Sequence, residues 1–216
     1  MGVIALTGGV AAGKSTVSAI LREQGAIVLD ADVFARKAVA AGSAGLHAIA
    51  EAFGTGVILP SGELDRTALG ALVFSDDNAR ATLNSILHPE VRRLSGRAIT
   101  QASAEHPDTV LVYDVPLLAE ARDPGEFDLI VVVDAPAAVR TARLREERGL
   151  TQVQAEAIVA AQATDEERLA LANVVLDSSQ SLEQTQHAAA ELYQALRSAW
   201  PARLSSVPPR FPSVAL

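Results

Sequence analysis

A glycine-rich loop near the start of the chain constrains its fold more than any other feature. Residues 8–15 read GGVAAGKS and fit the pattern G-x-x-x-x-G-K-[ST]. An apolar run at residues 3–6 precedes the loop, and apolar residues with helical spacing follow it up to residue 24. Backbone N–H groups of such a loop converge on phosphate oxygens, and the helix N-terminus favours the anion. The sequence therefore predicts binding of a nucleoside triphosphate.

Two side chains of this loop have expected chemical roles. We expect Lys14 to neutralise the β- and γ-phosphates and the Ser15 hydroxyl to bind Mg²⁺. The residues predicted to contact the nucleotide are those of the loop and of the first helical turn: Gly9, Val10, Ala11, Ala12, Gly13, Lys14, Ser15 and Thr16.

Continuous apolar runs predict the sheet. Residues 109–115 and 129–134 are apolar almost throughout, which is typical of parallel strands buried on both faces. Shorter runs at 3–6, 26–29 and 173–177 alternate with helical segments. The pattern predicts an α/β fold with a five-stranded parallel sheet, whose ligands bind at the carboxyl ends of the strands.

The helical segments predict how the domains are organised. Residues 33–53 indicate one helix, and residues 66–106 indicate two or three, interrupted at Asp76-Asp77-Asn78 and at His88-Pro89. We expect a helix from 136 to 148, another to about 171 and a closing helix at 181–199. The predicted nucleotide-binding core is thus 1–32 with 107–199, and 33–106 is an inserted helical domain. Residues 200–216 contain four prolines and are predicted to be a flexible tail or a linker.

Composition excludes several classes of function. The chain has 216 residues and no cysteine, which excludes disulfides, thiolate metal sites and cysteine nucleophiles. Its four histidines are scattered and do not form a metal-ligand pattern. A net charge of −8 argues against non-specific binding to nucleic acid. No run of about 20 apolar residues and no charged leader is present, so we expect a soluble, cytoplasmic protein without a membrane partner. The sequence does not determine the oligomeric state.

Two aspartates follow the second predicted strand. Asp30 and Asp32 are separated by one residue, so their side chains point the same way if the strand continues. Asp32 could accept a proton from an attacking hydroxyl group in phosphoryl transfer. The alternative is that Asp32 caps the next helix and Asp30 is solvated. Spacing alone leaves both interpretations open.

Charged residues later in the chain could also serve phosphoryl transfer. Arg140, Arg143 and Arg148 lie near one face of a predicted helix and could bind a transferring phosphoryl group. Alternatively they form a solvated face paired with neighbouring glutamates, although the phosphate-binding loop favours the first interpretation. Asp114 ends a predicted strand, where it could hold a Mg²⁺-bound water or bond to backbone.

Five segments in order resemble one enzyme family. Residues 6–16, 29–32, 83–88 with Pro89, 115–118 and 140–148 together resemble dephospho-CoA kinase, and no GTPase motif D-x-x-G with N-K-x-D is present. The resemblance covers about residues 3 to 195. It implies a P-loop kinase fold with an inserted helical substrate domain and a lid at about 141–165. It also implies transfer of the ATP γ-phosphate to the ribose 3′-hydroxyl of dephospho-CoA, with Mg²⁺ required.

The resemblance also implies roles for single residues. Asp32 would be the base, Lys14 and Arg140 would stabilise the transferred phosphoryl group, and Arg143 and Asn173 would contact the nucleotide. The residues implied to contact the acceptor substrate are Asp32, His88 and Leu117.

Two other functions remain open from the sequence. One is another metabolite kinase of the same class, such as a nucleoside monophosphate kinase or shikimate kinase. The other is a regulatory protein that hydrolyses a nucleoside triphosphate to switch partners. A kinase would consume ATP mainly when its acceptor is present, which separates the two.

Overall fold

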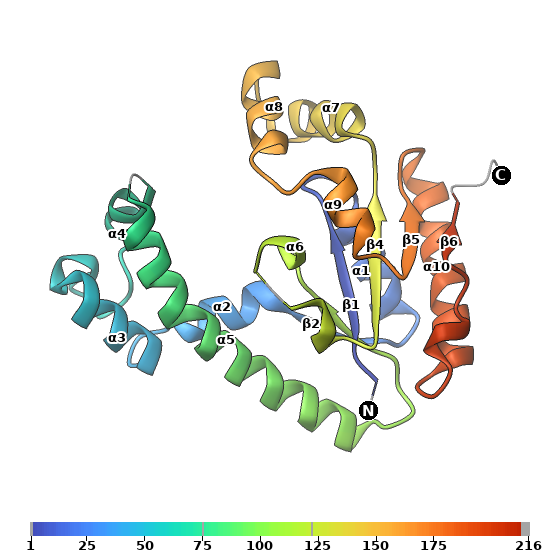
Figure 1. Cartoon of the computed structure of the whole chain (residues 1–216), viewed down its shortest axis with the longest axis horizontal. Coiled ribbons are helices and arrows are strands. Elements are labelled where there is room, and N and C mark those ends of the chain that lie inside the picture. The colour runs from blue at the N-terminus through green and yellow to red at the C-terminus, as the bar shows by residue number, and fades with distance from the viewer. Residues whose placement is uncertain (1, 75, 122, 213–216) are drawn as a thin grey trace. The chain divides into compact units, whose positions relative to one another are not determined.

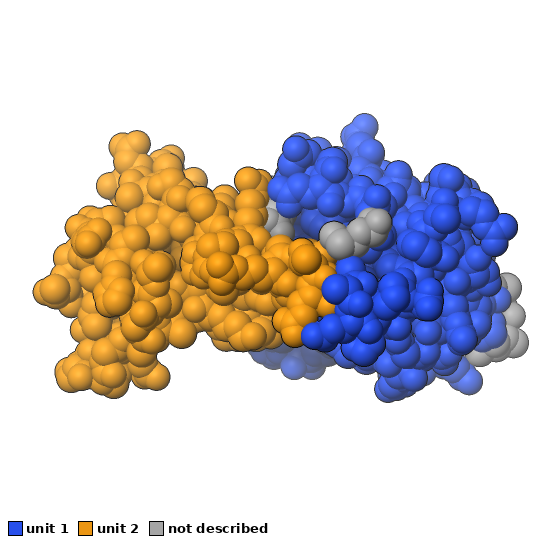
Figure 2. Space-filling model, turned by 90° about the horizontal axis from the view of Figure 1, so that it is seen from below, with its two compact units in different colours: residues 1–29, 102–216 blue, residues 30–101 orange. Residues whose placement is uncertain are grey.

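The computed structural model of the chain describes residues 2–74, 76–121 and 123–212. The chain divides into two compact units, residues 1–29 with 102–216 and residues 30–101 (Figure 2). The first unit contains the nucleotide-binding motif, and the second consists of helices inserted after the second strand.

A sheet with the order β2-β3-β1-β4-β5-β6 organises the first unit (Figure 1). The strands are β1 (Ile4–Gly8), β2 (Ile27–Asp30), β3 (Leu111–Asp114), β4 (Leu129–Asp134), β5 (Val174–Asp177) and β6 (Arg210–Phe211). Strand β1 pairs in parallel with β3 and β4, and β4 with β5 and β5 with β6 are also parallel. The five predicted strands are all present, and the sheet has a sixth that the sequence analysis missed.

The sixth strand shows that the prediction of a flexible tail was wrong for residues 200–211. Leu204, Val207 and Phe211 are buried in the main hydrophobic core, and Trp200 packs against that core. The N–H of Val175 in β5 donates to the carbonyl of Pro209. Proline lacks the N–H donor but keeps its carbonyl, so it can occupy an edge position of the sheet.

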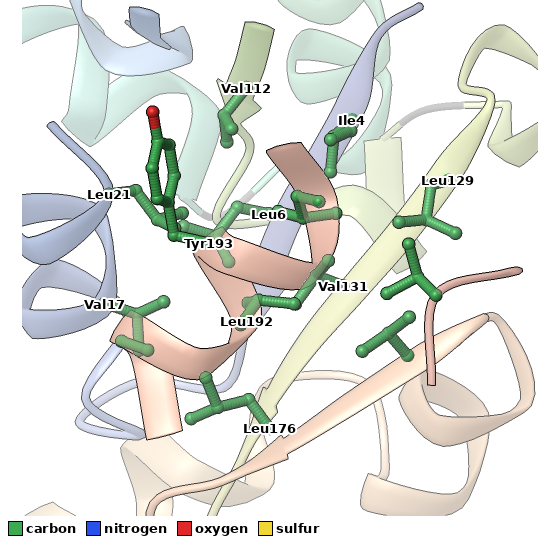
Figure 3. Packing of buried hydrophobic residues seen from close by; sticks show 14 of the residues in the cluster. Ile4, Leu6, Val17, Leu21, Val112, Leu129, Val131, Leu176, Leu192 and Tyr193 are labelled. Atoms are coloured by element: carbon green, nitrogen blue, oxygen red, sulfur yellow. The ribbon is translucent and has the colours of Figure 1, made fainter. Parts of the chain in front are cut away.

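Helices α1 (Lys14–Glu23) and α10 (Leu182–Ala199) pack against each other and supply much of the core. Figure 3 shows Leu21 of α1 and Leu192 of α10 close to Leu6 and Val131 of the central strands. The buried side chains of each helix lie on one face, because its apolar residues recur at helical spacing.

Three helices follow β4. They are α7 (Ala137–Arg148), α8 (Gln152–Ala160) and α9 (Asp165–Ala170). The chain between residues 149 and 171 was predicted to be one helix but forms two. Thr164 accepts a hydrogen bond from the N–H of Glu167, and the Glu167 side chain accepts one from the N–H of Thr164, so this capping box begins a new helix. The short helix α6 (Leu118–Ala121) follows β3.

The second unit is helical and contains α2 (Ala31–Ala38), α3 (Ala44–Phe53) and α4 (Arg66–Phe74). The single helix predicted at 33–53 is interrupted because Gly42 has a φ of +77° and Ser43 caps α3. A small core forms around Val39, Ile49 and Leu69.

The last helix of this region, α5 (Asp77–Glu105), runs through Pro89 without a break. The predicted interruption at His88-Pro89 was therefore wrong. Ser85 and Pro89 are exposed, so the carbonyl of Ser85, which loses its helical partner, can bond to water. Among the described residues, no helix has the length and apolar character needed to cross a membrane.

Candidate phosphate-binding site

The glycine-rich loop connects the end of β1 to the start of α1, as its sequence predicted. Gly8 lies so close to β4 that an added Cβ atom would be 2.6 Å from the carbonyl oxygen of Val133. Gly13 has a φ of +89°, and Ala11, which is not a glycine, has a φ of +56°. Both values lie in the left-handed region that L side chains rarely adopt. The loop backbone is therefore left-handed at two positions, and only one of them, Gly13, is a glycine.

A cavity of about 610 Å³ opens over this loop. It is lined by every residue from Gly8 to Thr16, including the backbone at the N-terminus of α1. The other lining residues come from the ends of β3, β5 and the later helices: Pro116, Arg143, Glu146, Glu147, Arg148, Gln162, Gln180, Leu182 and Thr185. The loop residues predicted to contact a nucleotide therefore all border one cavity.

The Lys14 ammonium group forms an ion pair with the carboxylate of Asp114 at the end of β3. The lysine side chain is 16% exposed and the aspartate side chain 8%. The hydroxyl of Ser18, one turn along α1, donates to the other carboxylate oxygen at 3.0 Å. Asp114 thus has two side-chain partners, both from the helix that begins at the loop.

Arg140 is buried next to the loop, with 2% of its surface exposed. Its Nε donates to the carbonyl of Ala135 at 3.0 Å, and Nη2 donates to Asp165 at 2.5 Å. Its Nη1 has no hydrogen-bond partner among the described residues. Burial lowers the pKa of the Arg140 guanidinium, while the charge of Asp165 opposes that change. One donor group of this buried cation therefore has no partner within the described part of the chain.

Gly9 of the loop lies against this guanidinium. A Cβ atom on Gly9 would be 2.7 Å from Nη1 of Arg140 and 3.2 Å from Nη2 of Arg168. Arg168 is also buried and donates to Asp165 and to the carbonyl of Ala163. The two guanidinium groups share the carboxylate of Asp165, and both also interact electrostatically with the carboxyl group of Asp134.

Arg143 and Ser178 hold the loop from another side. Arg143 donates to the carbonyl of Ala11 at 3.2 Å and to the carbonyl of Ser178 at 2.5 Å. The Ser178 hydroxyl donates to the carbonyl of Ala12, and its N–H donates to the carbonyl of Asp134 at 2.8 Å. Burial, with a smaller contribution from Asp165, raises the pKa of the Asp134 carboxyl group. The contacts of Arg143 and Ser178 hold the carbonyl groups of Ala11 and Ala12 in place.

Asp30, at the end of β2, and Asp32, in α2, have local roles that differ from the helix-capping alternative considered in the sequence analysis. The Asp30 side chain accepts a hydrogen bond from the N–H of Asp32 at 2.8 Å and caps α2. The alternative in which Asp32 is the cap was therefore wrong. Asp32 lies in the first turn of α2 and is exposed, so its carboxylate is free of the capping role.

Asn173, which was predicted to contact the nucleotide, lies away from the glycine-rich loop. Its side chain accepts from the N–H of Ile130 at 2.8 Å, and its own N–H donates to the carbonyl of that residue. It precedes β5, and Ile130 lies near the start of β4, so Asn173 is at the amino ends of the parallel strands. The glycine-rich loop begins at the carboxyl ends, where Gly8 pairs with Val133, three residues or about 10 Å further along the strands at 3.3 Å per residue.

The remaining predicted residues lie outside the loop cavity. His88 is exposed on α5 in the second unit, and Leu117, just before α6, is 47% exposed. Sequence reasoning also missed four residues at the loop, namely Gln162, Asp165, Arg168 and Ser178. Only Ser178 had a signal, because it follows a strand end at Asp177-Ser178-Ser179 where ligand-binding residues of parallel sheets gather.

The geometry suits a nucleotide polyphosphate. Backbone N–H groups at a helix N-terminus, one lysine and a buried arginine with a free donor all favour a multiply charged anion. The exposed Ser15 hydroxyl and the Asp114 carboxylate are oxygen ligands of the kind that Mg²⁺ prefers. Among the residues described, no group of three or more His, Cys, Asp or Glu side chains could hold a metal by itself. Mg²⁺ usually keeps waters and binds substrate phosphates, so one carboxylate and one hydroxyl fit it.

Comparison with known proteins identifies relatives that match most of the chain. Residues 2–184 match the profile of the dephospho-CoA kinase family. The dephospho-CoA kinase of Leifsonia xyli is 47% identical over 197 residues, which cover 91% of this chain and 100% of that protein. The enzyme of the same name from Streptomyces avermitilis is 47% identical over 190 residues, 88% of this chain and 91% of that protein. The dephospho-CoA kinase structure from Campylobacter jejuni has a TM-score of 0.72 at 22% identity, covering 91% and 98% of the two chains.

Proposed function

This chain belongs to the dephospho-CoA kinase family, and we propose that it transfers the γ-phosphate of ATP to the ribose 3′-hydroxyl of dephospho-CoA. The products are coenzyme A and ADP. The observation that supports this proposal most directly is the cavity over the glycine-rich loop, which Lys14 and Arg143 line, with the buried Arg140 guanidinium behind Gly9 of the loop. Among the metabolites that kinases of this fold phosphorylate, the proposal selects dephospho-CoA as the acceptor.

The loop and its cations bind the phosphates of ATP in this proposal. The N–H groups of the loop and of the first turn of α1 hold the phosphate oxygens, and Lys14 leaves Asp114 to contact the terminal phosphates. The free Nη1 donor of Arg140 binds the transferring phosphoryl group, where negative charge must be stabilised in the transition state. Arg143 supports the nucleotide indirectly, because it fixes the carbonyl of Ala11.

Ser15 and Asp114 would hold Mg²⁺ together with the substrate phosphates. Bound there, the ion would neutralise charge on the β- and γ-phosphates during transfer. Asp114 is released for this role when the Lys14 ammonium group moves to the phosphates. The exchange of partners keeps both charged side chains paired in the free and the bound states.

The acceptor side of the reaction belongs to Asp32 and the inserted helices. Asp32 accepts the proton of the 3′-hydroxyl group. The 3′-oxygen then bonds to the γ-phosphorus, and the bond between the γ-phosphorus and the oxygen that bridges to the β-phosphate breaks. We propose that residues 30–101 bind the acceptor, that His88 and Leu117 contact it, and that about residues 141–165 form a lid that excludes water. The role of Asp32 is supported by its free carboxylate beside a helix cap that Asp30 already supplies.

An assay of ADP formation with dephospho-CoA as acceptor tests the proposed function. We expect ADP to form only when dephospho-CoA is present and the product to carry a phosphate on the 3′-oxygen, identified by mass and by NMR. Shikimate and AMP serve as rival acceptors, and a dephospho-CoA analogue with a 3′-deoxyribose serves as the matched negative control. ATP hydrolysis at the same rate without any acceptor would contradict the proposal.

A further inference from the structure

One side chain joins the connection between α8 and α9 to the glycine-rich loop. Gln162 lies in that connection, and its Oε1 accepts a hydrogen bond of 2.7 Å from the backbone N–H of Val10. The two residues are 152 positions apart in the chain. The connection itself is fixed, because the buried Arg168 donates to the carbonyl of Ala163. The contact therefore joins two anchored segments.

The hydrogen bond determines which way the Gln162 carboxamide faces. A backbone N–H can only donate, so the atom opposite Val10 must be the oxygen, and the amide orientation follows from that partner. The Nε2 group then presents its two N–H donors elsewhere. No partner for Nε2 occurs among the residues that the structure describes, and the side chain is half-buried at the wall of the loop cavity. Gln162 thus offers uncommitted donors at that wall.

These donors lie on the same part of the loop as the free donor of Arg140. Arg140 contacts Gly9, and Gln162 contacts Val10, the next residue. The guanidinium Nη1 has no partner among the described side chains and is buried. Two unpartnered donor groups beside adjacent loop residues suit a group with several acceptor oxygens, and a terminal phosphate supplies three. A γ-phosphate bound there would have no counterpart in ADP.

We propose that Gln162 binds the terminal phosphate of the nucleotide through Nε2 while Oε1 holds the Val10 N–H in place. This inference rests on the proposed function, because it assigns a further residue to the same site. It predicts that Gln162 distinguishes ATP from ADP and stabilises the phosphoryl group during transfer. A purely structural contact would use Oε1 alone.

Two substitutions separate these roles. Gln162→Ala removes both the acceptor and the donors, whereas Gln162→Glu keeps an acceptor for Val10, loses the donors and adds a negative charge facing the phosphate. We expect Gln162→Ala to lower kcat by about 100- to 1,000-fold, the usual effect of one lost transition-state donor. Gln162→Glu should lower kcat at least as much. Its affinity for ADP should stay within about twofold of the wild type, because the donors have no partner in ADP.

Calorimetry and steady-state kinetics measure these effects, with melting curves to show that each variant folds. The matched control is Gln186→Glu, which places the same charge on an exposed position of α10. Wild-type kcat in Gln162→Glu would overturn the proposal, because an acceptor would then be sufficient. An equal loss of ADP and ATP affinity in Gln162→Ala, with kcat unchanged, would also overturn it by showing that the residue only shapes the loop.

The binding arm separates this inference from the proposed function. A non-hydrolysable ATP analogue should bind Gln162→Glu more weakly than the wild type by about tenfold or more, while ADP binds both alike. This comparison needs no acceptor. If the wild type failed to phosphorylate dephospho-CoA yet the difference between the two nucleotides was present, the proposed substrate would be wrong and the role of Gln162 would stand. Equal loss for both nucleotides would reject the role of Gln162 alone.

Discussion

Removing Lys14 should affect both the rate and the stability, and the two effects should be separable. The ammonium group pairs with Asp114, whose side chain is 8% exposed. Lys14→Ala would leave that carboxylate with the Ser18 hydroxyl as its remaining side-chain partner shown at this site. Breaking a fully buried pair from one side costs about 3–5 kcal/mol. The Lys14 side chain is 16% exposed, so water enters and we expect a cost of about 2 kcal/mol.

That cost corresponds to a fall in Tm of about 4–8 °C for a chain of this length. The loss of a positioned cation should lower kcat at least about 100-fold. The double variant Lys14→Ala with Asp114→Asn removes the uncompensated charge and keeps an acceptor for Ser18. It should regain at least about half of the lost Tm but none of the lost rate.

Differential scanning calorimetry and the ADP assay are run on Lys14→Ala, Asp114→Asn, the double variant and the wild type. The chain contains one other lysine, Lys37, which is exposed on α2, so Lys37→Ala is the matched control. Retention of more than about a tenth of the wild-type kcat in Lys14→Ala would refute the phosphate role. An unchanged Tm in Lys14→Ala would refute the energetic argument for the buried carboxylate.

Three further changes test other parts of the argument. Asp32→Asn should lower kcat by about 10²- to 10⁴-fold with ATP affinity and Tm unchanged, because Asp30 still caps α2; an unaltered kcat would contradict the base assignment. Phe211→Ala should destabilise the fold by about 3 kcal/mol, seen as a Tm about 6–12 °C lower, whereas Pro212→Ala at the exposed neighbour should not. Because the pKa of Asp134 is raised on folding, its carboxyl group reduces stability as pH rises above the ordinary value of 3.8. The Tm of Asp134→Asn minus that of the wild type should therefore increase between about pH 4 and pH 7, and a decrease would show the opposite sign of the shift.

The sequence was sufficient for the central strands but not for the edge of the sheet. Strand β4 (Leu129–Asp134) is buried on both faces, so its sequence is a continuous apolar run that has few other interpretations. Strand β6 has two residues and follows Pro208-Pro209. Its pairing depends on the buried contacts of Leu204, Val207 and Phe211 with distant residues, and no local pattern encodes such contacts.

Small shifts in local structure changed the interpretation of individual residues. Helix α2 begins at Ala31, so the capping role belongs to Asp30, and a start two residues later would have given it to Asp32. Helix boundaries of this kind vary by one or two residues and are the least predictable part of an element. Asn173 was assigned through resemblance alone, and the strand register places it at the opposite ends of the strands.

The glycine-rich motif explains why the chain binds phosphate, but the shape of its loop depends on residues far away in the sequence. Ala11 has a φ of +56°, a conformation that costs an L-residue about 1–2 kcal/mol. Its carbonyl accepts from Arg143, the carbonyl of Ala12 accepts from Ser178, and the N–H of Val10 donates to Gln162. Each partner lies on α7 or beyond, and net hydrogen-bond contributions of about 1 kcal/mol each are enough to offset the strain. A substitution at any of the three distant residues should therefore alter the nucleotide site without changing the motif itself.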